Sequence, residues 1–126
     1  MYLKHVAIIK LINVNLILKG GNLWKEDSDM NEGRNYAGAC IDNNEGKIYV
    51  VGGCLTKKTS TAEVFNITTS KWTNIANTNT KRDSSGVVHV PQLGETFSIG
   101  GYNNRSKEYL KSAEKYDQGN KRIFLT

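Results

Sequence analysis

Few residues of this chain have the types and spacing that catalysis or metal binding requires. The sequence has two histidines, His5 and His89, and two cysteines, Cys40 and Cys54. The cysteines do not have the spacing of zinc ligands, and no CxxC pair is present. Glycine-rich phosphate loops, HExxH, GxSxG and paired carboxylates are also missing from the sequence. The sequence therefore predicts a protein that is not an enzyme and that uses no metal or cofactor.

The residues around the two cysteines indicate in which cellular compartment the protein lies. Apolar residues and glycines flank both, which favours buried thiols in a reducing environment over a disulfide. We therefore expect a cytoplasmic protein. Residues 6–18 are mostly apolar, but Lys10, Asn13 and Asn15 interrupt them, so we expect a strand there and neither a membrane span nor a signal peptide.

The amino-acid composition limits the possible fold classes and the possible kinds of partner. The net charge is +5, from 17 lysines and arginines against 12 acidic residues. No stretch concentrates the basic residues as a phosphate-binding face does, so we expect no nucleic-acid partner. Twelve glycines against one proline, with 38% apolar residues, favour a strand-rich chain with tight turns. An all-β fold is the prediction.

An internal repeat organises most of the chain. Residue n matches residue n+48 over about thirty positions, and the offset later becomes 51. The three extra residues fall in a polar stretch between Gly101 and Ala113, and insertions confined to a loop are typical of a structural repeat. The matched pairs include Trp24 and Trp72, Arg34 and Arg82, Gly38 and Gly86, Gly52-Gly53 and Gly100-Gly101, Glu63 and Glu114, and Phe65 and Tyr116.

Each unit divides into four short strands. In the first unit they are predicted at residues 37–41, 47–51, 62–66 and 71–75, separated by polar turns and one variable loop. Four hairpin-linked strands in about 40–50 residues are typical of a propeller blade. Tyr49, Phe65 and Trp72 are predicted to pack one sheet on another.

The order of these motifs resembles the kelch repeat. The first unit carries IYVVGG, AEVFN and KWTNI, and the second carries TFSIGG and AEKYD. The resemblance covers residues 24–124 and implies four-stranded antiparallel blades of a β-propeller. It divides the chain into a non-kelch segment (1–23), the last strand of a preceding blade (24–33), one repeat (34–81) and one incomplete repeat (82–126). Because closed propellers have at least four blades, we expect a piece of a larger propeller.

The resemblance also implies a function, which is to bind a protein or peptide through loops at one end of the blades. Arginine suits that role because its planar guanidinium can clamp a carboxylate with two hydrogen bonds. The alternative is that such an arginine caps a turn or lies in solvent. The candidate residues are Arg34, Tyr36, Lys57, Lys58, Thr59, Arg82, Ser84, Tyr102, Asn103, Asn104 and Arg105.

The chain is most similar to the kelch-like proteins that also carry BTB and BACK domains. That subgroup implies substrate recognition for a cullin-based ubiquitin ligase. Binding to actin or another cytoskeletal protein is the alternative.

Overall fold

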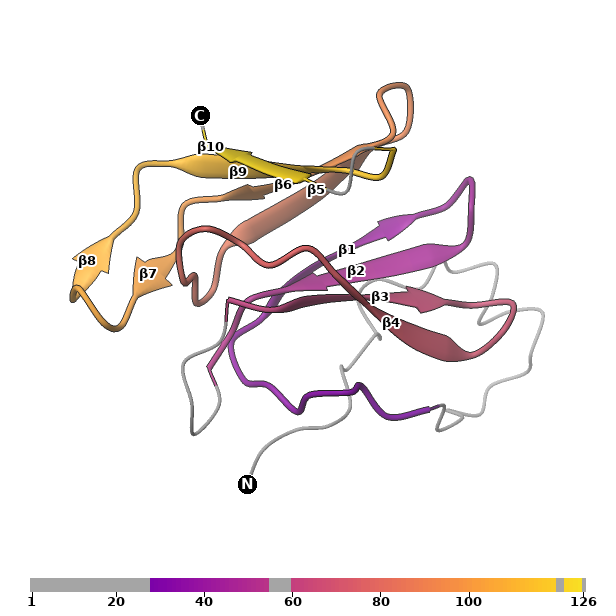
Figure 1. Ribbon diagram of the computed structural model, residues 1–126, viewed down its shortest axis with the longest axis horizontal. Coiled ribbons are helices and arrows are strands. Elements are labelled where there is room, and N and C mark those ends of the chain that lie inside the picture. Colours follow the sequence, from indigo (N-terminus) through magenta and orange to yellow (C-terminus); the bar gives the residue numbers. More distant parts are fainter. Residues whose placement is uncertain (1–27, 55–59, 120–121, 126) are drawn as a thin grey trace, which may run out of the picture.

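The computed structural model describes residues 28–54, 60–119 and 122–125, the last of these as backbone only. These residues form ten β-strands and no helix, which confirms the prediction of an all-β chain (Figure 1). The strands are β1 (Gly38–Asp42), β2 (Lys47–Val51), β3 (Ala62–Asn66), β4 (Lys71–Ile75), β5 (Gly86–Val90), β6 (Glu95–Ile99), β7 (Tyr102–Asn103), β8 (Glu108–Tyr109), β9 (Ala113–Asp117) and β10 (Arg122–Leu125).

The strands form two four-stranded sheets and one hairpin. The first sheet has the order β1-β2-β3-β4, and the second has the order β10-β9-β6-β5. Every neighbouring pair is antiparallel. The hairpin β7-β8 projects from one end of the second sheet, and the two sheets stack face to face (Figure 1).

Most strand predictions match the structure. Strands β2, β3 and β4 have the predicted bounds, and β1 begins and ends one residue later than predicted. The second unit, expected to be incomplete, has its fourth strand, since β10 pairs with β9 along four residues. Position 123 lies opposite Tyr116 just as Trp72 lies opposite Phe65. The missing tryptophan therefore does not prevent the fourth strand from pairing.

Two predicted segments lie outside the described residues. They are the strand expected within residues 6–18 and the part of the preceding blade around Trp24. Residues 28–33 form no strand. They pack on the first sheet, where Met30 is buried with Ile48, Val50 and Phe65.

We call the face of the first sheet that packs on the second sheet its front face, and the opposite face its back face. In the second sheet, the front face is the one that carries the equivalent residues of the repeat. The front face of the first sheet packs on the back face of the second. Cys40 and Tyr49 of the first sheet form a buried cluster with Tyr116 of the second. The rings of Tyr49 and Tyr116 are 6.3 Å apart.

On the back face of the first sheet the rings of Phe65 and Trp72 are 5.0 Å apart. Tyr49 packs between the two sheets as predicted. Phe65 is buried and Trp72 is half-buried against Met30, Ile48 and Val50, away from the second sheet.

His89 lies in the contact between the sheets. Its ring stacks on Tyr49 with 5.3 Å between centroids, and its Nδ1 lies 2.9 Å from Thr96 Oγ1. Its Nε2 lies 3.4 Å from the buried carboxylate of Asp42. His89 is therefore a polar contact within the interface.

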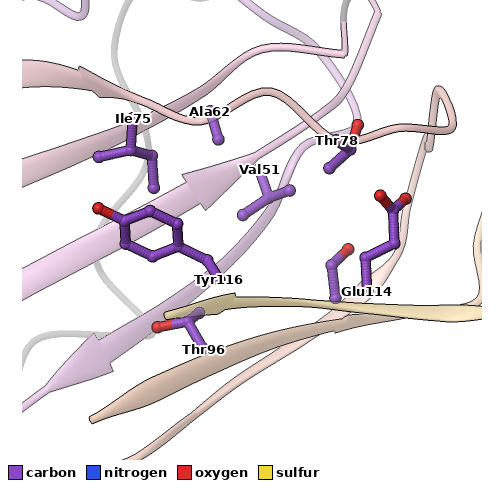
Figure 2. A pocket seen from close by; sticks show the side chains of 8 residues that line it. Val51, Ala62, Ile75, Thr78, Thr96, Glu114 and Tyr116 are labelled. Atoms are coloured by element: carbon purple, nitrogen blue, oxygen red, sulfur yellow. The ribbon is translucent and has the colours of Figure 1, made fainter. Parts of the chain in front are cut away.

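Where Val51 and Ala62 meet Ser98 and Glu114, the gap between the sheets is only about 10 Å³. Farther along the interface the sheets diverge around an open groove of about 480 Å³, which is lined by Lys47, Val64, Asn66, Thr73, Asn74, Ile75, Ala76, Tyr116 and Gln118. Figure 2 shows Tyr116 and Glu114 of the second sheet beside Val51, Ala62 and Ile75 of the first. Burial also raises the pKa of the Cys40 thiol to about 12, with a smaller contribution from the Asp42 carboxylate. The interface is thus tightly packed around Val51, Ala62 and Glu114 and opens near Val64 and Gln118.

Candidate functional site

Arg34 is buried in the segment that leads into β1. Its Nη2 donates to Glu63 Oε2 at 2.7 Å, and both side chains are fully buried. Its Nη1 donates to the carbonyl oxygens of Gly52 at 2.9 Å and Thr61 at 2.8 Å. The Glu63 carboxylate also accepts the backbone N–H of Asn31 at 2.7 Å. This arginine therefore joins the segment before β1 to β3 and to the glycine doublet.

Arg82 repeats this arrangement in the second unit. Its Nε donates to Glu114 Oε2 at 2.8 Å, and both side chains are again fully buried. Its Nη1 donates to the carbonyl oxygens of Gly100 and Ser112, both at 2.9 Å. Glu114 also accepts the backbone N–H of Asn79 at 2.5 Å. The pairing of arginine and glutamate is thus part of the repeat itself.

These contacts correct the expectation that Arg34 and Arg82 bind a partner. Each guanidinium already binds an internal carboxylate and lies away from solvent. A buried charge needs such a partner, because the desolvation penalty of an ion is several kcal/mol. The two arginines therefore neither clamp an external carboxylate nor lie in solvent. The residues that sequence reasoning missed are Glu63 and Glu114, whose signal was their recurrence together with the arginines.

The segment around Arg82 also holds the two units together. The N–H of Gly53 donates to the carbonyl oxygen of Arg82 at 2.9 Å. A Cβ atom on Gly52 would lie 2.2 Å from that same oxygen. Gly52 and Gly53 have φ of +67° and +94°, a region that glycine adopts readily and other residues avoid. The glycine doublet therefore lets the next unit begin directly against the preceding sheet.

Tyr36 and Ser84 occupy equivalent exposed positions beside the buried arginines. Their φ angles are 56° and 53°, and the N–H of Ser84 donates to the carbonyl oxygen of Tyr36 at 2.7 Å. Tyr36 is 71% exposed and Ser84 is also exposed. The structure thus brings these two predicted residues together at one end of the sheets.

The hairpin β7-β8 extends this end of the molecule. Tyr102 is joined to Asp83, the neighbour of Ser84, by a pair of backbone hydrogen bonds of 2.9 Å. Asn103 Oδ1 accepts the backbone N–H of Arg105 at 2.9 Å, which turns the chain and leaves the Arg105 side chain exposed. The predicted residues of both units therefore lie on adjoining segments.

Tyr109, on β8, completes the group. It is 84% exposed, and its ring lies 5.1 Å from that of Tyr102. Tyr109 was not predicted from the sequence, because the hairpin arises within an inserted polar loop. We define the loop face by its members, which are Tyr36, Ser84, Tyr102, Asn103, Asn104, Arg105 and Tyr109. The remaining predicted residues, Lys57, Lys58 and Thr59, lie outside the described part of the chain.

The described residues show neither a metal site nor a membrane-spanning helix. Within residues 28–54 and 60–119, no group of three or more histidine, cysteine or acidic side chains could hold a metal ion. The described part of the chain also has no helix that is long and apolar enough to cross a membrane. Cys40 and Cys54 are both reduced.

Comparison with known families agrees with this geometry. Residues 33–79 match the family model described as Kelch motif. The matched stretch begins just before Arg34, ends just after Thr78, and includes the whole first sheet. Kelch repeats generally serve to bind other proteins.

Solved structures show the same fold. A protein described as "Structure of YjhT" matches with a TM-score of 0.66 and 16% sequence identity, over 79% of this chain and 29% of that one. It is one of 127 matching chains. The 29% coverage means that this chain spans less than a third of the YjhT structure. At this identity the likeness concerns the kelch-type propeller fold. The curated proteins gave no match.

Proposed function

We propose that the chain binds a protein partner through its loop face. The observation that carries this proposal is that adjoining segments expose Tyr36 (71%) on one side and Tyr109 (84%) and Arg105 on the hairpin. Tyrosine and arginine are among the residue types that dominate the energy of protein interfaces, and tyrosine buries a large area at low entropic cost. A soluble protein has little reason to expose such residues together unless they contact something.

The segments that carry the loop face are held in place by hydrogen bonds, which favours binding. Backbone hydrogen bonds join Tyr36 to Ser84 and Asp83 to Tyr102, so segments from both units are linked directly. The buried arginines fix the bases of the same segments. Binding costs less when a surface is already ordered before its partner arrives. We infer from this arrangement a binding role without catalysis.

The partner can be tested by capture and by substitution. We expect Tyr36→Ala and Tyr109→Ala each to weaken a captured partner about tenfold or more, as loss of an interface hot spot does. Leu93→Ala is the matched control, because Leu93 is also exposed but lies in the turn between β5 and β6, at the other end of the sheet. Quantitative capture from lysate, followed by titration of the purified partner, gives the readout. A partner whose affinity is unchanged by both tyrosine substitutions binds elsewhere and refutes the proposal.

A more specific form of the proposal follows from the resemblance to kelch-like proteins with BTB and BACK domains. In that form the loop face holds a substrate for a cullin-based ubiquitin ligase in the cytoplasm. Filamentous actin offered to the full chain, and a ubiquitination assay of the captured partner with a cullin-based ligase, distinguish the candidates. Co-sedimentation with actin that the tyrosine substitutions abolish would favour a cytoskeletal role. A captured partner that is neither cytoskeletal nor ubiquitinated by such a ligase leaves the loop-face proposal standing and removes both specific assignments.

A further inference from the structure

The groove between the two sheets is a second concave surface, and none of its residues belongs to the loop face. Strands β1 and β5 lie against each other, whereas the groove lies at β3, β4 and β9. Its floor is apolar and only partly buried, and consists of Val64, Ile75 and Ala76. The floor packs on the buried cluster that contains Tyr49 and Tyr116. The volume of about 480 Å³ is within the usual range of binding clefts, about 300–1,000 Å³.

The hydroxyl group of Tyr116 faces the groove. Tyr116 is only 7% exposed, and its hydroxyl makes no hydrogen bond with the part of the chain that the structure describes. Figure 2 shows this hydroxyl at the end of the ring away from Glu114 and Thr78. A buried hydroxyl without a partner costs free energy, so an occupant of the groove that bonds to it is favoured.

The groove is bordered by a strand with a free edge. Within the described residues β4 pairs only with β3, so one row of its N–H and C=O groups faces outward. Lys71 and Thr73 on this strand are exposed. Extended peptides bind such an edge by adding a strand, and their alternate side chains then enter neighbouring pockets. A strand added to β4 places every second side chain over the groove.

The charge of the groove indicates which peptides it favours. Lys47, Asn66 and Lys71 lie opposite one another across β2, β3 and β4, so two lysines lie at one end. Lys47 Nζ lies 2.5 Å from Glu45 Oε2, but within the described chain no acidic residue pairs with Lys71. None of the described residues that line the groove is acidic. Because opposite charges on neighbouring strands attract, an occupant with a carboxylate at this end is favoured.

We propose that the groove binds an extended peptide of a partner protein, which adds to the edge of β4 and carries an acidic residue followed by apolar ones. Lys71, Thr73 and Ile75 project from the same face of β4 at two-residue intervals. The peptide therefore places its carboxylate opposite Lys71, and apolar side chains two and four residues away, opposite Thr73 and Ile75. The proposal does not depend on the loop face.

The chain itself does not supply such a peptide. Residues 1–23 contain three lysines and no acidic residue, so they lack the carboxylate that Lys71 favours. Two copies of β4 paired edge to edge also lack it, because the strand reads KWTNI. The complementary charge therefore comes from another protein.

The test measures binding of the fluorescein-labelled peptide GDTITVTG to the full chain by fluorescence anisotropy. We expect this peptide to bind about tenfold more tightly than GKTITVTG, in which lysine replaces the acidic residue. Lys71→Glu should reverse the preference, whereas Lys111→Glu, at an exposed lysine outside the groove, should leave it unchanged. Tyr116→Phe should weaken binding of the acidic peptide about fivefold, as loss of one hydrogen bond does, without changing the thermal midpoint of the free chain.

Three results would overturn the proposal. Equal affinity of the two peptides, or no measurable binding of either, would show that the groove does not select a carboxylate. An affinity that Lys71→Glu leaves unchanged would place the peptide elsewhere on the chain. Tighter binding of a synthetic peptide of residues 6–18 than of the acidic peptide would make the chain's own segment the occupant. The comparison of the two peptides uses the unsubstituted chain, so it decides even if circular dichroism shows that Lys71→Glu fails to fold.

Discussion

Replacing Arg82 with methionine tests whether the buried arginines are structural. Arg82 donates four hydrogen bonds, to Glu114 Oε2, to the carbonyl oxygens of Gly100 and Ser112, and to Ser112 Oγ. Arg82→Met removes all of them and keeps most of the apolar stem. It leaves the Glu114 carboxylate buried, with only backbone N–H donors such as that of Asn79. Removing one partner of a buried ion pair costs about 3–5 kcal/mol.

A loss of that size is a large part of the stability of a small domain, which is about 5–15 kcal/mol. With a urea m-value of about 1–3 kcal/mol/M, the unfolding midpoint should fall by about 1–5 M. Urea unfolding followed by circular dichroism measures the shift. Arg105→Met is the matched control, because Arg105 is exposed on the hairpin and its loss should cost under about 0.5 kcal/mol.

The double variant Arg82→Met/Glu114→Leu separates the interaction energy of the ion pair from the cost of leaving one member buried without its partner. Replacing a buried ion pair by apolar residues is often neutral, so the double variant should regain at least about 2 kcal/mol relative to Arg82→Met alone. The reasoning is refuted if Arg82→Met costs less than about 1 kcal/mol, as a solvent-exposed arginine would. It is equally refuted if the double variant loses the sum of the two single losses.

Two further predictions concern the interface and the glycine doublet. Burial raises the pKa of both Tyr49 and Cys40 to about 12, so each stays neutral in the fold after the unfolded chain has ionised near 10.0 and 9.0. The stabilisation from these two groups is therefore full below about pH 9 and is lost as the pH rises toward 12. Tyr49→Phe should reduce this loss. Urea unfolding midpoints measured below pH 9 and near pH 12 give the comparison. Gly52→Ala should lower the thermal midpoint far more than Gly94→Ala, because both have φ near +66° but only the first places a Cβ against the backbone, 2.2 Å from the Arg82 carbonyl oxygen. Equal shifts would mean that φ alone, at about 1–2 kcal/mol, sets the cost.

The repeat made most of the fold predictable. Matching residues at a fixed offset located the strands of the first sheet to within one residue, since alternation and turn residues agree with the repeat there. The burial of Arg34 was not predicted, because arginine is seldom fully buried and its partner Glu63 lies in a strand 29 residues later. The hairpin β7-β8 was also missed, since two-residue strands in a polar loop leave no periodic pattern.

The comparison of the two units separates scaffold from surface. Where the units agree, as at Arg34 and Arg82, the side chain is buried and serves the fold. At the neighbouring positions the backbone agrees in φ, 56° and 53°, but the side chains are Tyr36 and Ser84. A partner that contacts both units therefore meets different side chains at positions where the backbone conformation is the same. Specificity must then reside in residues that do not repeat, such as Tyr36 and Ser84.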